Sequence, residues 1–175
     1  MYQELRGEKT NTPWYKLFFH NVARPWARFT LWIDLWNILP TKSRLARFGI
    51  ATDGKCNFCR SEESQEHMFF ACSFTGEIWQ KILNWIGFNR VPYGWNSEKE
   101  WAVVETSKKG WKRPILKAAI AETIYAIWTL RNAIIFKDQS MEEDIQHKTK
   151  TNVAIRCSVI PKLSNHVNLE ELSIR

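Results

Sequence analysis

Apolar residues recur along this chain with the spacing of α-helices. Between residues 114 and 136 they form one stripe over about six helical turns, which predicts a long helix whose stripe faces the core. A second run of apolar positions predicts a helix over 74–86 that ends at Gly87. Acidic residues at 142–144 followed by basic ones favour another helix over 141–160, because they complement the helix dipole. The pattern predicts a mainly α protein, a small helical domain without a substantial sheet.

Two aromatic-rich segments near the amino terminus predict two more helices, since Pro13 and Pro25 stand where a first helical turn tolerates proline. In the second segment, apolar residues recur at i, i+3, i+4 and i+7 and therefore share one helix face: Phe29, Trp32, Ile33 and Trp36. Thr41 stands where the N-cap of a short helix is expected, and that helix should stop at Gly49.

These elements divide the chain into four parts. Residues 12–86 are predicted to form a helical domain. Residues 87–110 contain Gly, Pro, Asn and Ser without a persistent helical period, which predicts a linker or long loop. Residues 111–160 are predicted to form C-terminal helices that pack on the first domain, and residues 161–175 a tail that follows Pro161.

Composition and charge refine this picture. The chain has 175 residues and a net charge of +7, and its ten Trp and ten Phe predict a Trp-rich core or an interface. Residues 1–50 carry 8 basic and 3 acidic side chains, whereas residues 51–100 carry 5 and 7, so the basic excess lies in the flanks of the chain. No apolar run approaches the roughly 18–20 residues that span a bilayer, and no apolar segment follows the amino terminus. We therefore expect an intracellular protein that is not secreted and does not bind membranes.

The sharpest chemical signal is a C-x2-C-x7-H-x4-C spacing formed by Cys56, Cys59, His67 and Cys72. All four side chains are zinc ligands, and a C-x2-C pair can place two thiolates about 2.3 Å from one ion. Four protein ligands leave no position for water, so the spacing predicts one structural Zn²⁺ and no catalysis at the metal. The ion would order loop 56–72, which has too few apolar residues to fold alone, so that its aromatic residues can pack on neighbouring helices.

Two alternatives to zinc remain open at this point. A C-x-x-C pair can be a redox pair, although a thioredoxin-like site needs a strand before it, and residues 50–55 have the composition of a turn. The cluster can also be a degenerate site that no longer binds metal. Cys157 lies outside the cluster and is expected to be a small buried residue.

Several short motifs in a fixed order between Trp14 and Trp79 resemble the zinc-binding domain that follows the reverse transcriptase in plant LINE-type (non-LTR) retrotransposons. A further motif resembles a segment found downstream in the same polyproteins. The resemblance implies a helical zinc module whose ligands are the three cysteines and His67, and it implies work in the nucleus. The motifs are Phe29-x-x-Trp32, Leu39-Pro40-Thr41, Cys56-x-x-Cys59, Glu66-His67-x-Phe69-Phe70-x-Cys72, Ile78-Trp79 and Tyr125-Ala126-Ile127-Trp128-Thr129-Leu130-Arg131-Asn132.

The function expected from these features is a structural zinc module that binds RNA or DNA non-specifically through its basic flanks. The alternative is a protein-interaction or scaffolding fragment without nucleic-acid affinity, which docks on a reverse transcriptase or on a second copy through Trp95, Trp101 and Trp111. A fragment without any selected activity is the third possibility. The basic candidates are Lys42, Arg44 and Arg47 in one group and Lys108, Lys109, Lys112 and Arg113 in the other.

We expect no enzymatic activity. The chain contains no Asp-Asp pair of the kind that a polymerase palm uses to hold metal ions. It also lacks a phosphate-binding G-x-x-x-x-G-K-[ST] motif, an H-E-x-x-H motif and a G-x-S-x-G motif.

Overall fold

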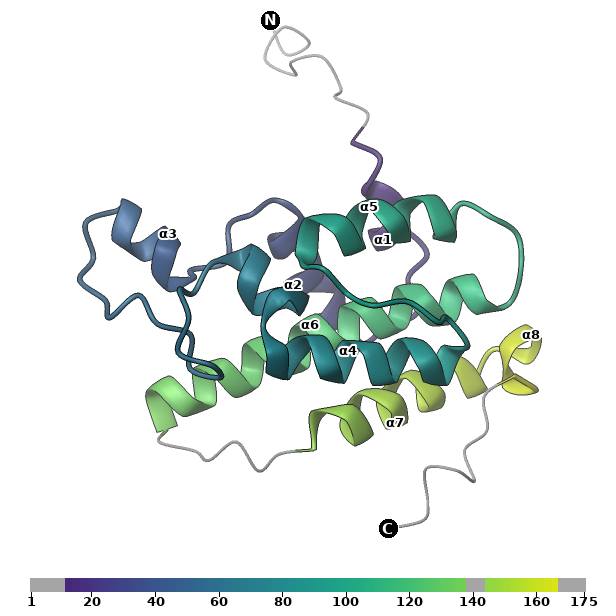
Figure 1. Cartoon of the computed structure of the whole chain (residues 1–175). Helices are drawn as coiled ribbons and strands as arrows, with labels where there is room; N and C mark the ends of the chain where they lie inside the picture. Colours follow the sequence, from purple (N-terminus) through teal and green to yellow (C-terminus); the bar gives the residue numbers. More distant parts are fainter. Residues whose placement is uncertain (1–11, 138–143, 167–175) are drawn as a thin grey trace, which may run out of the picture.

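The computed structural model describes residues 12–137 and 144–166, and within them it is mainly helical (Figure 1). The β structure in these ranges is one isolated antiparallel bridge between Lys55 and Glu62. The prediction of a mainly α protein is therefore confirmed. The elements are α1 (Tyr15–Phe18), α2 (Pro25–Leu35), α3 (Lys42–Arg47), the π-type turn η2 (His67–Ala71), α4 (Ser73–Ile86), α5 (Trp95–Thr106), α6 (Lys112–Lys137), α7 (Ile145–Ser158) and α8 (Pro161–Ser164).

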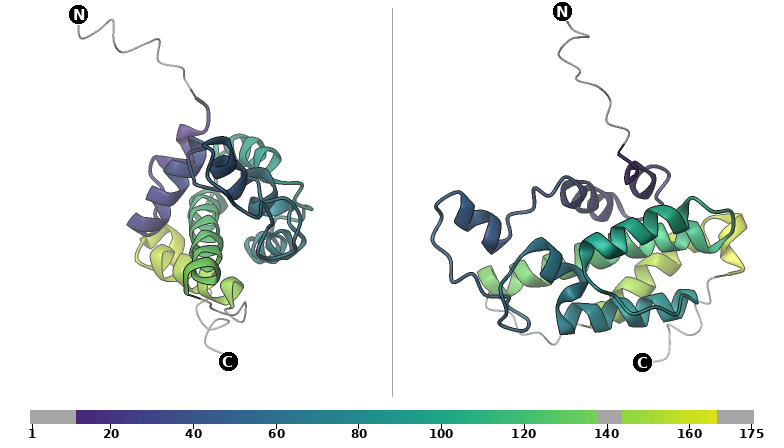
Figure 2. Two further views of the ribbon diagram at one scale, coloured as in Figure 1. Left: turned by 90° about the vertical axis from the view of Figure 1, so that its left-hand side faces the viewer. Right: turned by 45° about the horizontal axis from the view of Figure 1, so that its top comes forward.

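Helix α6 is the central element of the fold, and α2, α4, α5 and α7 pack around it (Figure 2). The stripe predicted from its sequence lies in the core, where Leu116, Ile120, Ile124 and Ile127 are at most 1% exposed. Alanines on other faces of α6 are buried as well, because neighbouring helices cover it on several sides. Although α6 has 26 residues, no helix among the described residues is long and apolar enough to cross a membrane.

The prediction of a linker or long loop over 87–110 is wrong for the middle of this segment, where α5 occupies Trp95–Thr106. The helical period is hidden because acidic side chains occupy two of the buried positions of α5, Glu98 and Glu105. Glu98 accepts a hydrogen bond from the indole N–H of Trp79 at 2.9 Å and forms an ion pair with Arg90. Trp95 begins α5 and is only 2% exposed, so its proposed role as an exposed docking residue is also wrong.

The carboxy-terminal helices differ slightly from their predicted bounds. Asp144 caps α7, because its side chain accepts a hydrogen bond from the His147 N–H at 2.9 Å. The predicted helix start at 141–143 lies outside the described residues. Within the predicted tail, Pro161–Ser164 form the single turn α8, and residues 167–175 lie outside the described ranges.

A buried ion pair connects the loop that contains the cysteines to the central helix. Glu63 and Arg131 are 0% and 3% exposed, and the guanidinium donates two hydrogen bonds to the carboxylate, of 2.6 and 3.3 Å. Glu63 also accepts the backbone N–H of Lys42 at 2.9 Å, and its carbonyl accepts the N–H of Ser43 at 3.1 Å. One glutamate therefore fixes the loop, the start of α3 and α6 relative to each other.

A second buried carboxyl group connects α2 to the same loop. Asp34 is 1% exposed, and the side-chain amide of Gln65 donates hydrogen bonds to its carboxyl group and to its backbone carbonyl. Burial raises the pKa of Asp34 to about 8, although the hydrogen bond from Gln65 acts in the opposite direction. The carboxyl group therefore carries its proton at neutral pH.

The Glu63–Arg131 pair predicts a large cost for Arg131→Met. This change leaves a carboxylate buried without its partner, so the free energy of unfolding should fall by about 3–5 kcal/mol. Urea denaturation of the zinc-loaded protein measures the loss. The matched control is Lys81→Met, which removes a cation from the exposed pair with Glu77 and should leave stability nearly unchanged. Similar small losses in both variants would contradict the structural role of the buried pair.

The raised pKa of Asp34 predicts a pH-dependent stability. In the folded protein this group binds its proton more tightly than in the unfolded chain, so its contribution is complete below pH 4 and is lost as pH rises through about 8. Between pH 6 and pH 8, wild type should lose about 2 kcal/mol relative to Asp34→Asn, whose amide does not ionise. Denaturation of both proteins at each pH gives the difference, and a constant difference would show that Asp34 does not titrate in this range.

Candidate metal centre

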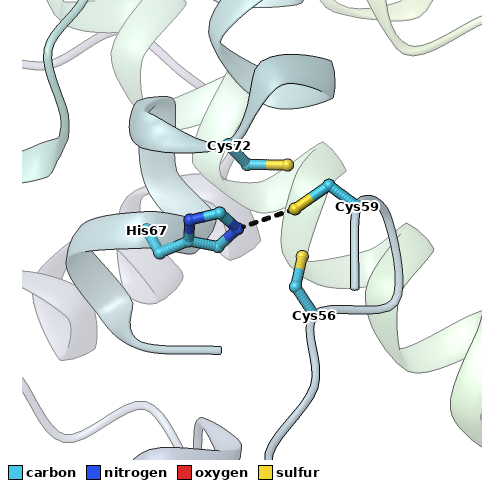
Figure 3. Close-up of side chains that lie close together, drawn as sticks. All are labelled: Cys56, Cys59, His67 and Cys72. Carbon is cyan, nitrogen blue, oxygen red and sulfur yellow. Dashed lines mark hydrogen bonds between the residues drawn. The ribbon is translucent and has the colours of Figure 1, made fainter. Parts of the chain in front are cut away.

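The four predicted ligands converge on one point (Figure 3). Their ligand atoms all lie within 4.8 Å of one another, and the Cys59 Sγ and His67 Nε2 atoms are 3.0 Å apart. Tetrahedral zinc with bonds of 2.0–2.3 Å places its ligand atoms about 3.5–3.8 Å from each other. Cys56, Cys59, His67 and Cys72 therefore fit one structural zinc ion, as predicted from their spacing.

A tight hairpin positions the first two ligands. The bridge between Lys55 and Glu62 closes it, and the Cys56 N–H donates to the carbonyl of Ser61 at 2.6 Å. Arg60 has a φ of 69°, which turns the chain back after the second cysteine. The Phe58 N–H points at the Cys56 sulfur, 3.4 Å away, and stabilises negative charge there.

A turn of irregular backbone positions the other two ligands at its two ends. Ser64 accepts the His67 N–H on its hydroxyl group at 3.1 Å, and the Cys72 N–H donates to the carbonyl of His67 at 2.7 Å. Phe70 has a φ of 83°, which redirects the chain toward Cys72. The backbone passes so close that a Cβ at Gly76 would lie 2.8 Å from the Phe70 carbonyl oxygen. Ser64 and Gly76 support the site, although no pattern in the sequence distinguishes them from other small residues.

The electrostatics of the site favour a metal-binding thiolate at Cys72. A hydrogen bond between the sulfur atoms of Cys56 and Cys72 raises the pKa of Cys56 to about 12 and lowers that of Cys72. Cys72 is also the N-cap of α4, where the backbone N–H groups of Thr75 and Phe74 lower its pKa further. Cys72 is therefore the first of these two sulfurs to ionise.

Aromatic residues of the loop pack inward against the helices. Phe58 stacks on Phe74 with the ring centroids 5.1 Å apart, and Phe70 stacks on Trp79 at 4.8 Å. Phe69 and Phe70 are at most 2% exposed. The metal centre is thus joined to the hydrophobic core by the aromatic side chains on both sides of it.

The redox alternative does not fit the local structure. The C-x-x-C pair lies in a hairpin, and no helix begins directly after it. Cys157, the fourth cysteine, lies apart from the cluster in α7, is fully buried, and has a pKa raised to about 11 by burial. The convergence of three sulfurs and an imidazole supports metal binding instead.

The structure separates the two groups of basic candidates. Lys42 is buried, donates to the carbonyl of Lys55 at 2.7 Å and forms an ion pair with Asp53, so its charge is used inside the protein. Arg44 donates to the carbonyl of Asn37 at 2.7 Å, and Arg47 is exposed. Among the described residues, neither arginine pairs with a carboxylate.

The second group lies at the turn between α5 and α6, at the opposite end of the molecule from α3 (Figure 1). Lys108 and Arg113 both form ion pairs with the buried carboxylate of Glu105. Lys112 donates to the carbonyl of Gly87 at 3.1 Å, and Lys109 is exposed. The structure therefore does not bring the two groups together on one continuous surface.

Comparisons with known proteins agree with this geometry. Residues 1–79 match a protein-family model described as zinc-binding in reverse transcriptase. No curated protein and no solved structure matches the chain. The matched segment contains all four ligand residues, so the amino-terminal part of the chain is similar to a zinc-binding domain of reverse transcriptases.

Proposed function

We propose that this chain is a zinc-organised helical module that binds nucleic acid non-specifically and has no catalytic role. In this proposal it derives from the carboxy-terminal part of a plant LINE-type polyprotein and works in the nucleus. The observation that carries the proposal is the position of Arg44 and Arg47 on α3. This helix lies beside residues 54–72, which carry the metal ligands and which we call the metal loop. Among the described residues, neither arginine has a carboxylate partner.

The charge of the surrounding segment supports an anionic partner. Between residues 12 and 50 there are six basic side chains and one acidic one, Asp34, which is buried and protonated at neutral pH. A surface that combines several cations with no exposed carboxylate from its own segment attracts phosphates at long range. The six basic residues are Lys16, Arg24, Arg28, Lys42, Arg44 and Arg47. Arg24 and Lys42 are paired with Glu122 and Asp53, so Lys16, Arg28, Arg44 and Arg47 supply the charge that attracts phosphates.

The metal loop holds α3 in place, which connects zinc to this function. Helix α3 has only six residues, too few to be stable by itself. The ammonium and backbone N–H of Lys42 bond to Lys55 and Glu63, which lie at the two ends of the cysteine hairpin. Zinc therefore supports nucleic-acid binding by ordering the helix that carries the arginines, without contacting the nucleic acid itself.

A protein-interaction fragment remains the second candidate, because large aromatic side chains are exposed. Trp111 is 39% exposed, and its ring stacks on His166. Trp101 is half-buried under the guanidinium of Arg90, 4.3 Å from the ring centroid, and is less suited to docking. Retention of a reverse transcriptase or self-association, without nucleic-acid affinity, would favour this candidate.

The proposed function predicts a local effect of charge reversal. In Arg44→Glu/Arg47→Glu, affinity for any nucleic-acid sequence should fall at least about tenfold, and the slope of log K against log salt should drop by about 1–2. Fluorescence anisotropy over a series of salt concentrations measures both quantities. The control Lys81→Glu/Lys162→Glu has the same net charge and should bind more tightly than the first variant. Equal losses, or no binding by wild type at low salt, would overturn the proposal.

Removal of zinc should unfold the cysteine loop. We expect about one zinc per wild-type chain by elemental analysis and a large loss in Cys59→Ser, together with a lower free energy of unfolding. The control Cys157→Ser changes a buried cysteine outside the cluster and should keep its zinc, whatever it costs in packing. Wild-type protein that is folded and free of zinc would show that the cluster is a relic.

A further inference from the structure

Helix α2 presents a row of aromatic side chains to solvent. Its inner face is buried against α6 through Ala27, Leu31 and Leu35. On the outer face, the exposed fractions are 70% for Trp26, 50% for Phe29, 38% for Trp32 and 51% for Trp36. Of the four residues that share a face by sequence spacing, Phe29, Trp32 and Trp36 therefore lie on the solvent-facing side of the helix, whereas Ile33 is half-buried against the core. Between residues 26 and 36 this row is about 15 Å long.

The rings of this row, which we call the α2 aromatic face (Trp26, Phe29, Trp32 and Trp36), support each other. Phe29 stacks on Trp32 with the centroids 6.2 Å apart, and Trp26 meets Phe29 edge-on at 6.4 Å. Trp36 is held by an edge contact with Trp14 at 5.1 Å. Mutual contacts limit the rotation of the rings, which lowers the entropy cost of placing a ligand on them.

Cations lie at both ends of the α2 aromatic face. At its start, three side chains donate to backbone carbonyls of the α1–α2 connection: Arg28 to Asn21, Arg156 to Val22 and Lys117 to Phe19. At its end, Arg44 donates to the carbonyl of Asn37, directly after the helix. Arg24 is excluded from this set, because its guanidinium is paired with the buried carboxylate of Glu122.

We propose that the α2 aromatic face binds single-stranded nucleic acid, whose unpaired bases stack on the exposed rings while its phosphates contact the cations at both ends. This inference rests on the proposed function and makes it more specific. A duplex hides the faces of its bases inside the helix, whereas a single strand offers them to aromatic side chains. The absence of an exposed carboxylate in residues 12–50 favours a polyanion over a protein partner, which would need acidic groups of its own to match these charges.

Stacking and phosphate contacts make different predictions, which allows them to be separated. Loss of a stacking ring weakens single-strand binding but leaves the number of released counterions unchanged. Loss of an arginine weakens binding to single strand and duplex alike and lowers the salt slope. A variant of the rings should therefore change the preference between the two forms of nucleic acid.

The test compares Trp26→Ala/Phe29→Ala with Tyr93→Ala/Phe136→Ala. Tyr93 and Phe136 are both 76% exposed and lie outside α2, so the control removes a similar amount of exposed aromatic surface elsewhere. The probes are a short fluorescein-labelled oligothymidylate and a duplex of equal length, each titrated with zinc-loaded full chain. Circular dichroism and the melting temperature establish that each variant is folded, as expected for substitutions of exposed side chains.

In Trp26→Ala/Phe29→Ala, we expect the affinity for the single strand to fall by about tenfold or more, with an unchanged salt slope. Its affinity for the duplex should stay within about twofold of wild type. The control variant should show no comparable loss for either probe. Equal losses for strand and duplex, or none for either, would overturn the inference while wild-type binding still supports the proposed function. Loss of self-association in the variant without a change in affinity would identify a second copy as the occupant instead. Failure of wild type to bind either probe would overturn the proposed function itself.

Discussion

Residues 54–66 contain a single large apolar side chain, Phe58, so this part of the metal loop cannot be held against the helices by hydrophobic burial alone. The buried ion pair of Glu63 with Arg131 supplies the missing attachment. It is bidentate and 2.6 Å at its shorter contact, and further hydrogen bonds to Glu63 from the start of α3 satisfy the remaining acceptors. A buried pair of this kind is favourable only with such complete hydrogen bonding, which fixes one orientation of the loop on α6.

The loop makes similar polar contacts with two other helices. Gln65 donates to the buried Asp34 of α2, and the carboxylate of Glu66 accepts the N–H of Asn96 in α5 at 2.8 Å. Glu63, Gln65 and Glu66 are nearly consecutive, yet they contact three different helices. The metal ligand His67 follows directly, so the ion and these polar contacts fix the same short segment of backbone. Zinc binding therefore influences the relative positions of helices that do not contain any of its ligands.

The sequence predicted those features that depend on short-range patterns. The long apolar stripe located α6, and the spacing of the cysteines and His67 located the metal centre, because both patterns lie within one element or one loop. Helix α5 was missed since its buried positions include Glu98 and Glu105, whose partners lie in other elements. Glu63 and Arg131 are 68 positions apart, and nothing local distinguishes them from surface residues. Likewise, Lys42 and Arg44 are both basic residues at the start of the same short helix, but of the two only Lys42 forms an ion pair with a carboxylate of the described residues, that of Asp53.

The orientation of α2 shows why an aromatic pattern alone does not define a core. The helix buries small and aliphatic residues, Ala27, Leu31 and Leu35, on the side that packs against the central helix α6. The larger rings lie on its other side, where their exposure favours aggregation. Proteins keep an exposed apolar surface of this kind where that surface binds a partner. Because the inner face of α2 already packs on α6, and the carboxyl group of Asp34 is already bonded to Gln65, a partner can occupy the aromatic face without disturbing the fold.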